Sequence, residues 1–254
     1  MPQPFIGDLP IDKVHFGRMI NDGSKQSVAL HRDDTSFKPS NKLVFNLCPD
    51  PRKPFACRYK LDTVREDSDG SRRGLMVRLQ DERTLAALKQ LDDLAVSTAL
   101  SNCKEWFKKP SMSEAEVRLR YKPLVFEDGG EHYLKFKVKC KGYVTELHLL
   151  REDNTVEENG GTLDHISEYG AFVAPILCCF SVWFMGGGTS FGISAQAEKM
   201  VVRPGAPRPA LSDFCCEEPL DVVVPQKKRP REGEDLLPEY EAYREEDRIV
   251  LDEE

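Results

Sequence analysis

The sequence predicts a mainly β protein: an antiparallel sheet or small barrel with one long inserted helix and a disordered acidic C-terminal tail. Three observations lead to this prediction. Short segments rich in β-branched and aromatic residues alternate with turn-forming residues, one long segment has helical periodicity, and the chain after Arg203 is rich in proline and charge. With 254 residues, 40% of them hydrophobic, the chain can form one sizeable core.

The first half contains several strand-like segments separated by glycine, proline, asparagine and aspartate, the residues typical of turns. The predicted strands are 12–20, 26–32, 42–48, 55–64 and 74–80. Strands at this spacing favour an antiparallel sheet or a small barrel.

One helix is predicted at about 82–108. Apolar residues recur there at helical spacing, at Leu85, Leu88, Leu91, Ala95 and Ala99. Asp81 or Thr84 is expected to cap its start, and Pro110 marks its end.

A second set of strands follows, at 116–126, 133–141, 143–151, 170–184 and 190–203. The sequences EDGGEH and MGGGT between them are typical of hairpin turns. Residues 1–203 are therefore expected to form one domain with the helix inserted between two sets of strands.

The charge of the chain is unevenly distributed. The whole sequence has a net charge of −7, but residues 211–254 alone carry 15 acidic and 6 basic residues. The preceding residues are slightly basic. Residues 204–254 are expected to be a disordered, proline-rich and acidic tail.

The sequence lacks an apolar segment long enough to span a bilayer and a recognisable secretory signal, so we expect a soluble, intracellular protein without a membrane partner. The eight cysteines form no C-x-x-C pair: Cys48, Cys57, Cys103, Cys140, Cys178, Cys179, Cys215 and Cys216. We expect free, mostly buried thiols and no metal site.

The sequence contains no common catalytic motif, such as a phosphate-binding G-x-x-x-x-G-K-[ST], G-x-S-x-G or H-E-x-x-H. Its five histidines stand alone, and the glycine-rich FMGGGTSFG joins two strands rather than opening a helix. We therefore expect a protein that is not an enzyme and needs no cofactor, although a catalytic site assembled from distant residues stays open.

The segment YLKFKVKCK, residues 133–141, alternates apolar and basic residues with a period of two. In a strand this places Lys135, Lys137, Lys139 and Lys141 on one face, about 6.6 Å apart at about 3.3 Å per residue. That spacing is close to the phosphate repeat of an extended single strand of nucleic acid. The alternative is a solvated edge that protects the strand from aggregation.

Other cations and aromatic residues add to this pattern. The further candidates for backbone contacts are Arg118, Arg120, Lys122, Lys108 and Lys109, and those for base stacking are Tyr133, Tyr143, Trp183 and Phe191. Cations along the backbone and rings under the bases are what sequence-independent binding of single strands requires. The alternative is that aromatics such as Trp106, Phe107 and Trp183 belong to the core.

The tail contains a basic cluster at 227–231, and the residues Lys227, Lys228, Arg229 and Arg231 are a candidate nuclear-import signal. The acidic end is expected to compete with nucleic acid for a basic groove and to bind a positively charged partner when the groove is filled. The alternative is a solubilising tail.

The segments VRLRYKPLVF, YLKFKVKCK and FSVWFMGGGTSFGISAQAEKMVVRP resemble single-stranded DNA-binding proteins of large nucleocytoplasmic DNA viruses. That group is similar to the podovirus-type phage single-stranded DNA-binding protein, an oligonucleotide/oligosaccharide-binding (OB) barrel with an acidic C-terminal tail. The resemblance covers roughly residues 40–203, including the helix that ends in WFKKP.

The resemblance implies an OB-like barrel that binds single-stranded DNA in DNA replication, recombination or repair. It also implies a homodimer and a tail that contacts a polymerase or helicase. The basic cluster at 227–231, a departure from the phage-type tail, suits a protein in the nucleus, so we expect a location in the nucleus or a viral replication compartment. A further departure is that the chain ends in Asp252, Glu253 and Glu254, whereas the phage-type tail ends in an aromatic residue. The alternatives are an RNA-binding module and a protein-interaction scaffold that acts through the acidic tail.

Overall fold

The computed structural model describes residues 3–22, 25–32, 42–59, 61, 71–142, 144–167 and 169–205. The chain divides into two compact units, 1–208 and 209–254, and all described residues belong to the first. The predicted tail beyond Gly205, the import cluster at 227–231 and Tyr143 lie outside the described residues.

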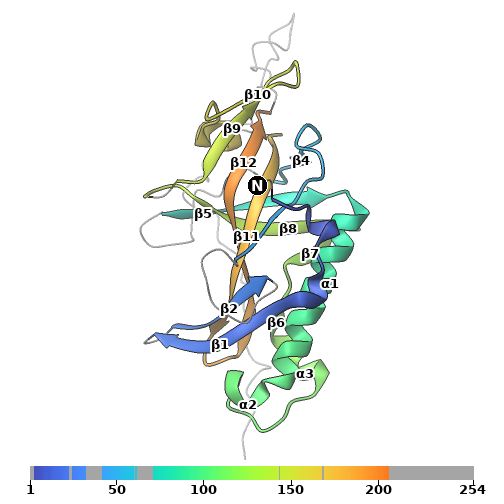
Figure 1. Ribbon diagram of the computed structural model, residues 1–254, viewed down its shortest axis with the longest axis vertical. Coiled ribbons are helices and arrows are strands. Elements are labelled where there is room, and N and C mark those ends of the chain that lie inside the picture. Colours follow the sequence, from blue (N-terminus) through green and yellow to red (C-terminus); the bar gives the residue numbers. More distant parts are fainter. Residues whose placement is uncertain are drawn as a thin grey trace, which may run out of the picture. The chain divides into compact units, whose positions relative to one another are not determined.

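Two long antiparallel strands form the centre of the sheet. Strands β11 (Phe172–Met185) and β12 (Ser190–Arg203) have 14 residues each and pair along their whole length (Figure 1). Gly186, Gly187 and Gly188 join them with φ angles of 57°, 63° and 89°, a backbone conformation that favours glycine. The predicted MGGGT hairpin is therefore confirmed.

The edge of β11 that faces away from β12 pairs with strands from the first part of the chain. β2 (Lys25–Arg32), β3 (Leu43–Asn46) and β4 (Phe55–Ala56) pair with it one after another, all antiparallel. β1 (Val14–Asp22) continues the sheet beyond β2.

The edge of β12 carries the strands from the middle of the chain. β6 (Tyr121–Lys122), β8 (Glu131–Lys139) and β9 (Glu146–Leu150) pair with it in parallel. β8 also pairs antiparallel with β5 and β7, and β9 with β10. These three strands are β5 (Arg72–Leu79), β7 (Val125–Asp128) and β10 (Val156–Glu157).

The fold class predicted from the sequence is confirmed, because the described residues form a mostly β structure with a curled sheet and one long helix. The predicted antiparallel arrangement is wrong at the three pairs that β12 makes with β6, β8 and β9. Parallel neighbours need long crossover connections, which strand periodicity alone does not reveal.

The long helix α1 (Glu82–Ser101) agrees with the predicted helix, and the Asp81 carboxylate caps it by accepting a hydrogen bond from Thr84 N at 2.7 Å. The helix breaks at Asn102, and a short helix α2 (Cys103–Trp106) follows. The remaining helices are η1 (Ile6–Asp8), η2 (Ile11–Lys13), α3 (Glu114–Arg120) and α4 (Leu163–Ser167). Within the described ranges, no helix has the length and apolar composition needed to cross a bilayer.

The helix α3 corrects the predicted strand at 116–126, because its residues up to Arg120 are helical. Ser113 and Glu116 form a capping box: the Ser113 hydroxyl accepts from Glu116 N, and the Glu116 carboxylate accepts from Ser113 N at 2.8 Å. Two satisfied donors at the first turn stabilise a helix even where the following residues alternate.

The core fills the space between one face of the sheet and α1. Leu88, Leu91 and Ala95 of α1 are 0% exposed and belong to one cluster with Val182 of β11 and Ile193 of β12. The six described cysteines are free thiols, and four of them are buried, as the sequence predicts.

Candidate nucleic-acid interface

Strand β8 has one apolar and one basic face, as its sequence predicts. Leu134, Phe136 and Val138 are at most 1% exposed and belong to the core. Lys135, Lys137 and Lys139 alternate with them and therefore point to the opposite face. Lys141 follows the end of the strand, so the lysine row predicted on one strand face has three members in β8 rather than four.

The register of the sheet extends this basic surface across neighbouring strands, because paired residues point to the same side. Lys137 pairs with Gln196 of β12, which pairs with Cys178 of β11. We call the sheet surface opposite the core the outer face. The strand register places several cations on the outer face, and Lys42 lies there beside Cys178. These cations are Lys42, Arg72, Arg78, Lys122, Lys135, Lys137, Lys139 and Lys199.

Strand β5 contributes two of these cations, which the sequence analysis missed. Arg72 pairs with Lys139, and Arg78 pairs with Tyr133. The signal was available for Arg78, because residues 75–79 alternate between buried and more exposed side chains like those of β8. The strand predicted at 74–80 starts two residues too late to include Arg72.

Lys122 and Trp183 are brought together by a glycine. Both residues pair with Gly192, one from β6 and the other from β11, so all three lie in one row of the outer face. A Cβ atom on Gly192 would lie 3.0 Å from the Trp183 ring and 2.7 Å from the Lys122 carbonyl oxygen. The missing side chain thus lets the indole and β6 approach the strand closely. Trp183 is half-buried, and its role in base stacking stays a prediction.

Tyr133 does not offer a ring face for stacking, which corrects the sequence prediction. It is 7% exposed. The Arg58 guanidinium lies 4.2 Å from the ring centroid, and the Phe126 ring stacks at 5.7 Å. Its hydroxyl donates a hydrogen bond to Glu131 at 2.5 Å. Tyr133 therefore helps to fix the β5–β8–β7 part of the sheet.

Phe191 is a core residue, which is a second correction. It is 0% exposed, and its ring lies 5.2 Å from that of Phe107 and 5.1 Å from that of Tyr121. Phe184 and Trp106 complete this aromatic cluster. Because Phe191 and Gly192 are adjacent in β12, they point to opposite faces, and only Gly192 faces outward.

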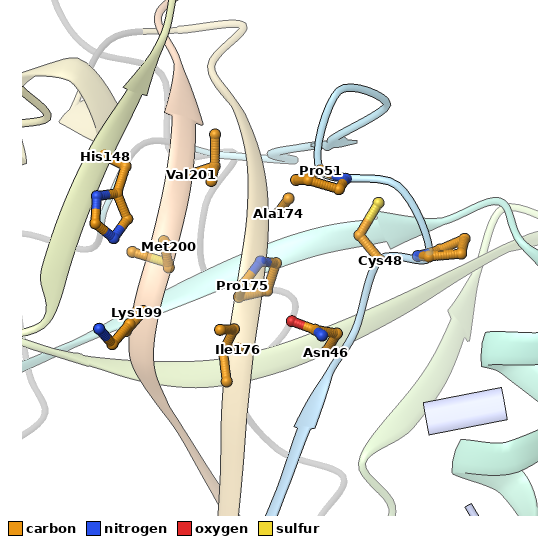
Figure 2. Close-up of a pocket in the computed structure, with 11 residues that line it drawn as sticks. Asn46, Cys48, Pro51, His148, Ala174, Pro175, Ile176, Lys199, Met200 and Val201 are labelled. Atoms are coloured by element: carbon orange, nitrogen blue, oxygen red, sulfur yellow. The ribbon is translucent and has the colours of Figure 1, made fainter. Parts of the chain in front are cut away.

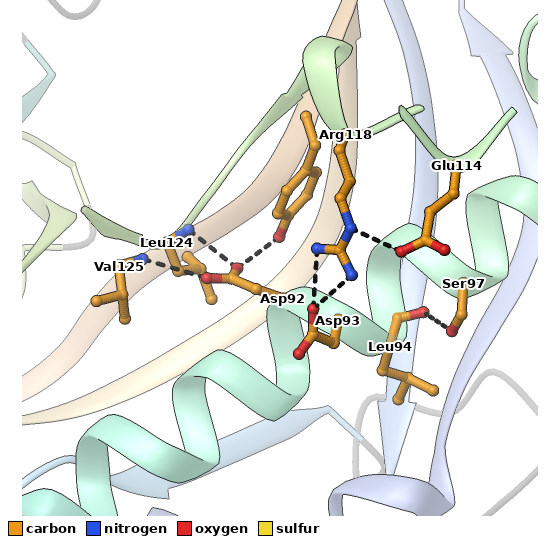
Figure 3. A network of polar contacts seen from close by, with 9 residues as sticks. Asp92, Asp93, Leu94, Ser97, Glu114, Arg118, Leu124 and Val125 are labelled. Carbon is orange, nitrogen blue, oxygen red and sulfur yellow. Dashed lines mark hydrogen bonds and ion pairs between the residues drawn. The ribbon is translucent and has the colours of Figure 1, made fainter. Parts of the chain in front are cut away.

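The arginines of α3 bind within the protein, which corrects their predicted alignment on a strand with Lys122. Arg118 forms ion pairs with Glu114 at 2.8 Å and Asp93 at 3.0 Å (Figure 3). Arg120 donates a hydrogen bond to the Gly188 carbonyl oxygen at 2.8 Å and lies over the Phe107 ring. Both arginines therefore attach α3 to its neighbours.

Lys108 and Lys109 follow α2 rather than lying on the lysine face of β8. Lys108 has a φ of 57° and donates a hydrogen bond to the Glu105 carbonyl oxygen at 3.1 Å. Hydrogen bonds with Ser113 lower the pKa of the Glu116 carboxyl on α3, and the nearby charge of Lys109 lowers it further. The two lysines thus belong to the surface near α2 and α3.

A buried carboxylate next to these helices has a structural role. Asp92 of α1 accepts hydrogen bonds from Tyr121 Oη at 2.6 Å, Leu124 N at 3.0 Å and Val125 N at 3.3 Å (Figure 3). Burial raises the pKa of Asp92 to about 6, and these hydrogen bonds oppose the rise. Through these hydrogen bonds the Asp92 carboxylate joins α1 to β6 and β7 on the core side of the sheet.

Carboxylates lie beside part of the outer face. Lys199 pairs with Glu146 at 2.7 Å, Arg78 with Glu131 at 2.7 Å, and Lys139 with Glu198 at 3.8 Å. These pairs are partly exposed, and exposed pairs contribute about 0–1 kcal/mol each. A phosphate that approaches the surface can replace such a carboxylate at low cost.

Comparison with known proteins finds matches among solved structures alone. No protein-family model and no curated protein match the sequence. The chain is similar to gp2.5, a single-stranded DNA-binding protein encoded by bacteriophage T7, at 12% identity and a TM-score of 0.42, covering 71% of this chain and 97% of that one. It is also similar to the single-stranded DNA-binding protein from bacteriophage Enc34 in complex with single-stranded DNA, at 10% identity and a TM-score of 0.36, covering 76% and 97%.

Proposed function

We propose that this protein binds single-stranded DNA without strong sequence preference. One observation carries the proposal: the strand register places Lys135, Lys137 and Lys139 of β8, Arg72 and Arg78 of β5, Lys122 and Trp183 on the same face of the sheet, opposite the core. A fold does not need such a surface for its own stability, and a row of cations beside an aromatic ring is suited to a flexible polyanion with planar bases.

The roles of the residues follow from their positions. Lys135, Lys137 and Lys139 stand at the spacing of successive phosphates and bind the backbone. Trp183 stacks one base, and Lys122 binds the phosphate next to it. Because each contact is to a phosphate or a base face, it does not distinguish one base from another. No bond is made or broken in this process, so the protein acts by binding and needs no cofactor.

We further propose the setting that the sequence resemblance and the basic cluster of the tail indicate. The protein acts in DNA replication, recombination or repair, in the nucleus or in a viral replication compartment. Its acidic tail contacts replication proteins such as a polymerase or a helicase, and the domain at 1–203 forms a homodimer. Membership in the group from large nucleocytoplasmic DNA viruses belongs to the same proposal.

The experiment is a titration of fluorescently labelled single-stranded DNA, duplex DNA and single-stranded RNA with the full chain at low salt. We expect the single-stranded DNA to bind at least about tenfold more tightly than the duplex, whose stacked bases cannot reach Trp183. Equal binding of RNA would make the protein an RNA-binding module. No binding of any strand, also after truncation of the tail at Pro209, would overturn the proposal.

A matched pair of variants shows whether the outer face is the site. The double variant Lys137→Ala/Lys139→Ala removes two charges from the outer face. The control Lys89→Ala/Lys104→Ala removes two charges from the exposed surfaces of α1 and α2. Both pairs change the net charge equally, so a loss of affinity confined to the first pair locates the DNA on β8. An equal loss in both would mean that only the overall charge matters.

A further inference from the structure

A pocket lies on the outer face at the end of the sheet farthest from Trp183. It has a volume of about 210 Å³ and is formed where β3, β11, β12 and β9 lie side by side (Figure 2). Drug-sized ligands occupy pockets of roughly 300–1,000 Å³. This pocket is smaller and fits a single planar ring system.

The lining of the pocket is apolar in the centre and polar at the margin. Ala174, Ile176 and Val201 lie on the central strands, and Pro51 lies on the side away from His148 and Lys199 (Figure 2). Pro49 also lines the pocket. The Cys48 Sγ lies 2.9 Å from the Asp50 carbonyl oxygen and 3.0 Å from that of Lys53, so its single proton is shared between them and holds the loop that carries the prolines. Flat aliphatic and proline surfaces of this kind accept the face of an aromatic ring.

Two polar side chains on the opposite side have defined orientations. His148 Nδ1 accepts a hydrogen bond from Asn159 N at 3.1 Å, which leaves Nε2 as the donor, and Nε2 lies 3.5 Å from the Glu146 carboxylate. Lys199 is half-exposed and pairs with Glu146 at 2.7 Å. The margin thus offers a hydrogen-bond donor and a cation beside an apolar centre (Figure 2).

The pocket is continuous with the candidate DNA-binding surface along β12. Gly192 pairs with Trp183, and Val201 in the pocket pairs with Ala174. These two positions are nine residues apart, which corresponds to about 30 Å at about 3.3 Å per residue. Between them, Gln196 adjoins Lys137. An extended single strand of four to five nucleotides covers that distance, and roughly 4–16 nucleotides is the range bound by one OB fold.

We propose that this pocket binds one unstacked nucleobase of the bound single strand, with its phosphate on Lys199. The inference rests on the proposed function, because the ligand is a base of the same DNA strand. It adds a second base-binding position to Trp183 and fixes the path of the strand along β12, past the lysines of β8.

Photo-crosslinking tests the position directly. A dodecamer of thymidine carries 5-iodouracil at one position, is bound to the full chain and irradiated, and the crosslinked peptides are identified by mass spectrometry. We expect crosslinks to peptides that contain His148 or Met200, in addition to Trp183. Crosslinks to Trp183 and β8 without any in the pocket would overturn this inference and leave the proposed function intact. No binding and no crosslink anywhere would overturn both.

A variant that fills the pocket provides a second test. Ala174→Leu adds three carbon atoms to the pocket lining, and the control Val156→Leu enlarges a 40%-exposed side chain on β10, outside the pocket. We expect Ala174→Leu to weaken binding of the dodecamer about tenfold, the loss of one stacked base, and the control to bind normally. Melting temperatures of both variants establish that they are folded. Normal binding by a folded Ala174→Leu variant would contradict the inference.

Discussion

Trp183 lies directly across the β11–β12 ladder from Gly192, and the edge of its indole occupies the space that a side chain at Gly192 would take. On the far side of the same glycine lies Lys122. A half-buried aromatic ring, a flat glycine surface and an exposed lysine therefore form one row on the outer face, next to the basic residues of β5 and β8.

Tryptophan fluorescence can report on DNA binding at this row, because the chain has two tryptophans and one of them is Trp183. Trp106 is 3% exposed within the aromatic cluster, whereas Trp183 faces outward. In the variant Trp106→Phe, Trp183 is the remaining emitter, and we expect oligothymidine to quench its fluorescence strongly because a base stacks on the indole. In Trp183→Phe, the emission of Trp106 should change little.

Affinity gives the matching energetic result. Removal of one base-stacking ring is expected to cost about 1–3 kcal/mol of binding free energy, so Trp183→Ala should weaken binding by about 5- to 150-fold. Quenching of Trp106 instead of Trp183, or unchanged affinity of Trp183→Ala, would show that the DNA does not reach this row.

Phe191 should behave as a core residue. It is fully buried among the rings of Phe107, Tyr121 and Phe184. We expect Phe191→Leu to lower the free energy of unfolding by about 1–3 kcal/mol, because ring contacts are lost and a small cavity forms. Its affinity for single-stranded DNA, measured at a temperature where the variant is folded, should equal that of the wild type. If Phe191→Leu instead lost affinity for single-stranded DNA without losing stability, Phe191 would be part of the binding site.

Asp92 should make stability depend on pH. Burial raises the pKa of Asp92 from 3.8 to about 6, so the folded protein holds a proton on this carboxyl more tightly than the unfolded chain does. The stabilising contribution is fully present below about pH 4 and is lost as the pH rises through about 6. At 1.36 kcal/mol per pKa unit, the loss is about 2–3 kcal/mol.

The variant Asp92→Asn lacks this titration and provides the reference. The difference in unfolding free energy between wild type and variant, obtained from urea denaturation at several pH values between 4 and 7, should fall by that amount as the pH rises. Parallel stability curves for the two proteins would contradict the pKa and the burial that causes it.

The sequence predicts features that depend on local periodicity. The alternation at 133–139 is confirmed because a strand with one buried face has a period of two regardless of its partners. The helix predicted at about 82–108 is confirmed over 82–101 for the corresponding reason, since its apolar spacing and the Asp81 cap are local to this segment. At 114–120 the alternating arginines favoured a strand, but the capping box of Ser113 and Glu116 made the segment helical.

The distinction between Trp183 and Phe191 could not be predicted, because it depends on the register between strands. The pairing of β11 with β12 shifts between Ile176 and Leu177 and again between Cys179 and Ser181, and each shift reverses which residues face the core. Both strands are apolar on both faces over much of their length, so periodicity gives no sign of these shifts.

The salt dependence of single-stranded DNA binding tests the central claim most directly. Each phosphate neutralised on a single strand contributes about 0.7 to the slope of log affinity against log salt concentration. The wild type should have a slope of about −2 or steeper, if at least the three lysines of β8 each bind a phosphate. Lys137→Ala/Lys139→Ala should reduce the slope by about 1.4, and Lys89→Ala/Lys104→Ala should leave it unchanged. A slope near zero for the wild type, or equal slopes for the wild type and the β8 variant, would contradict the account.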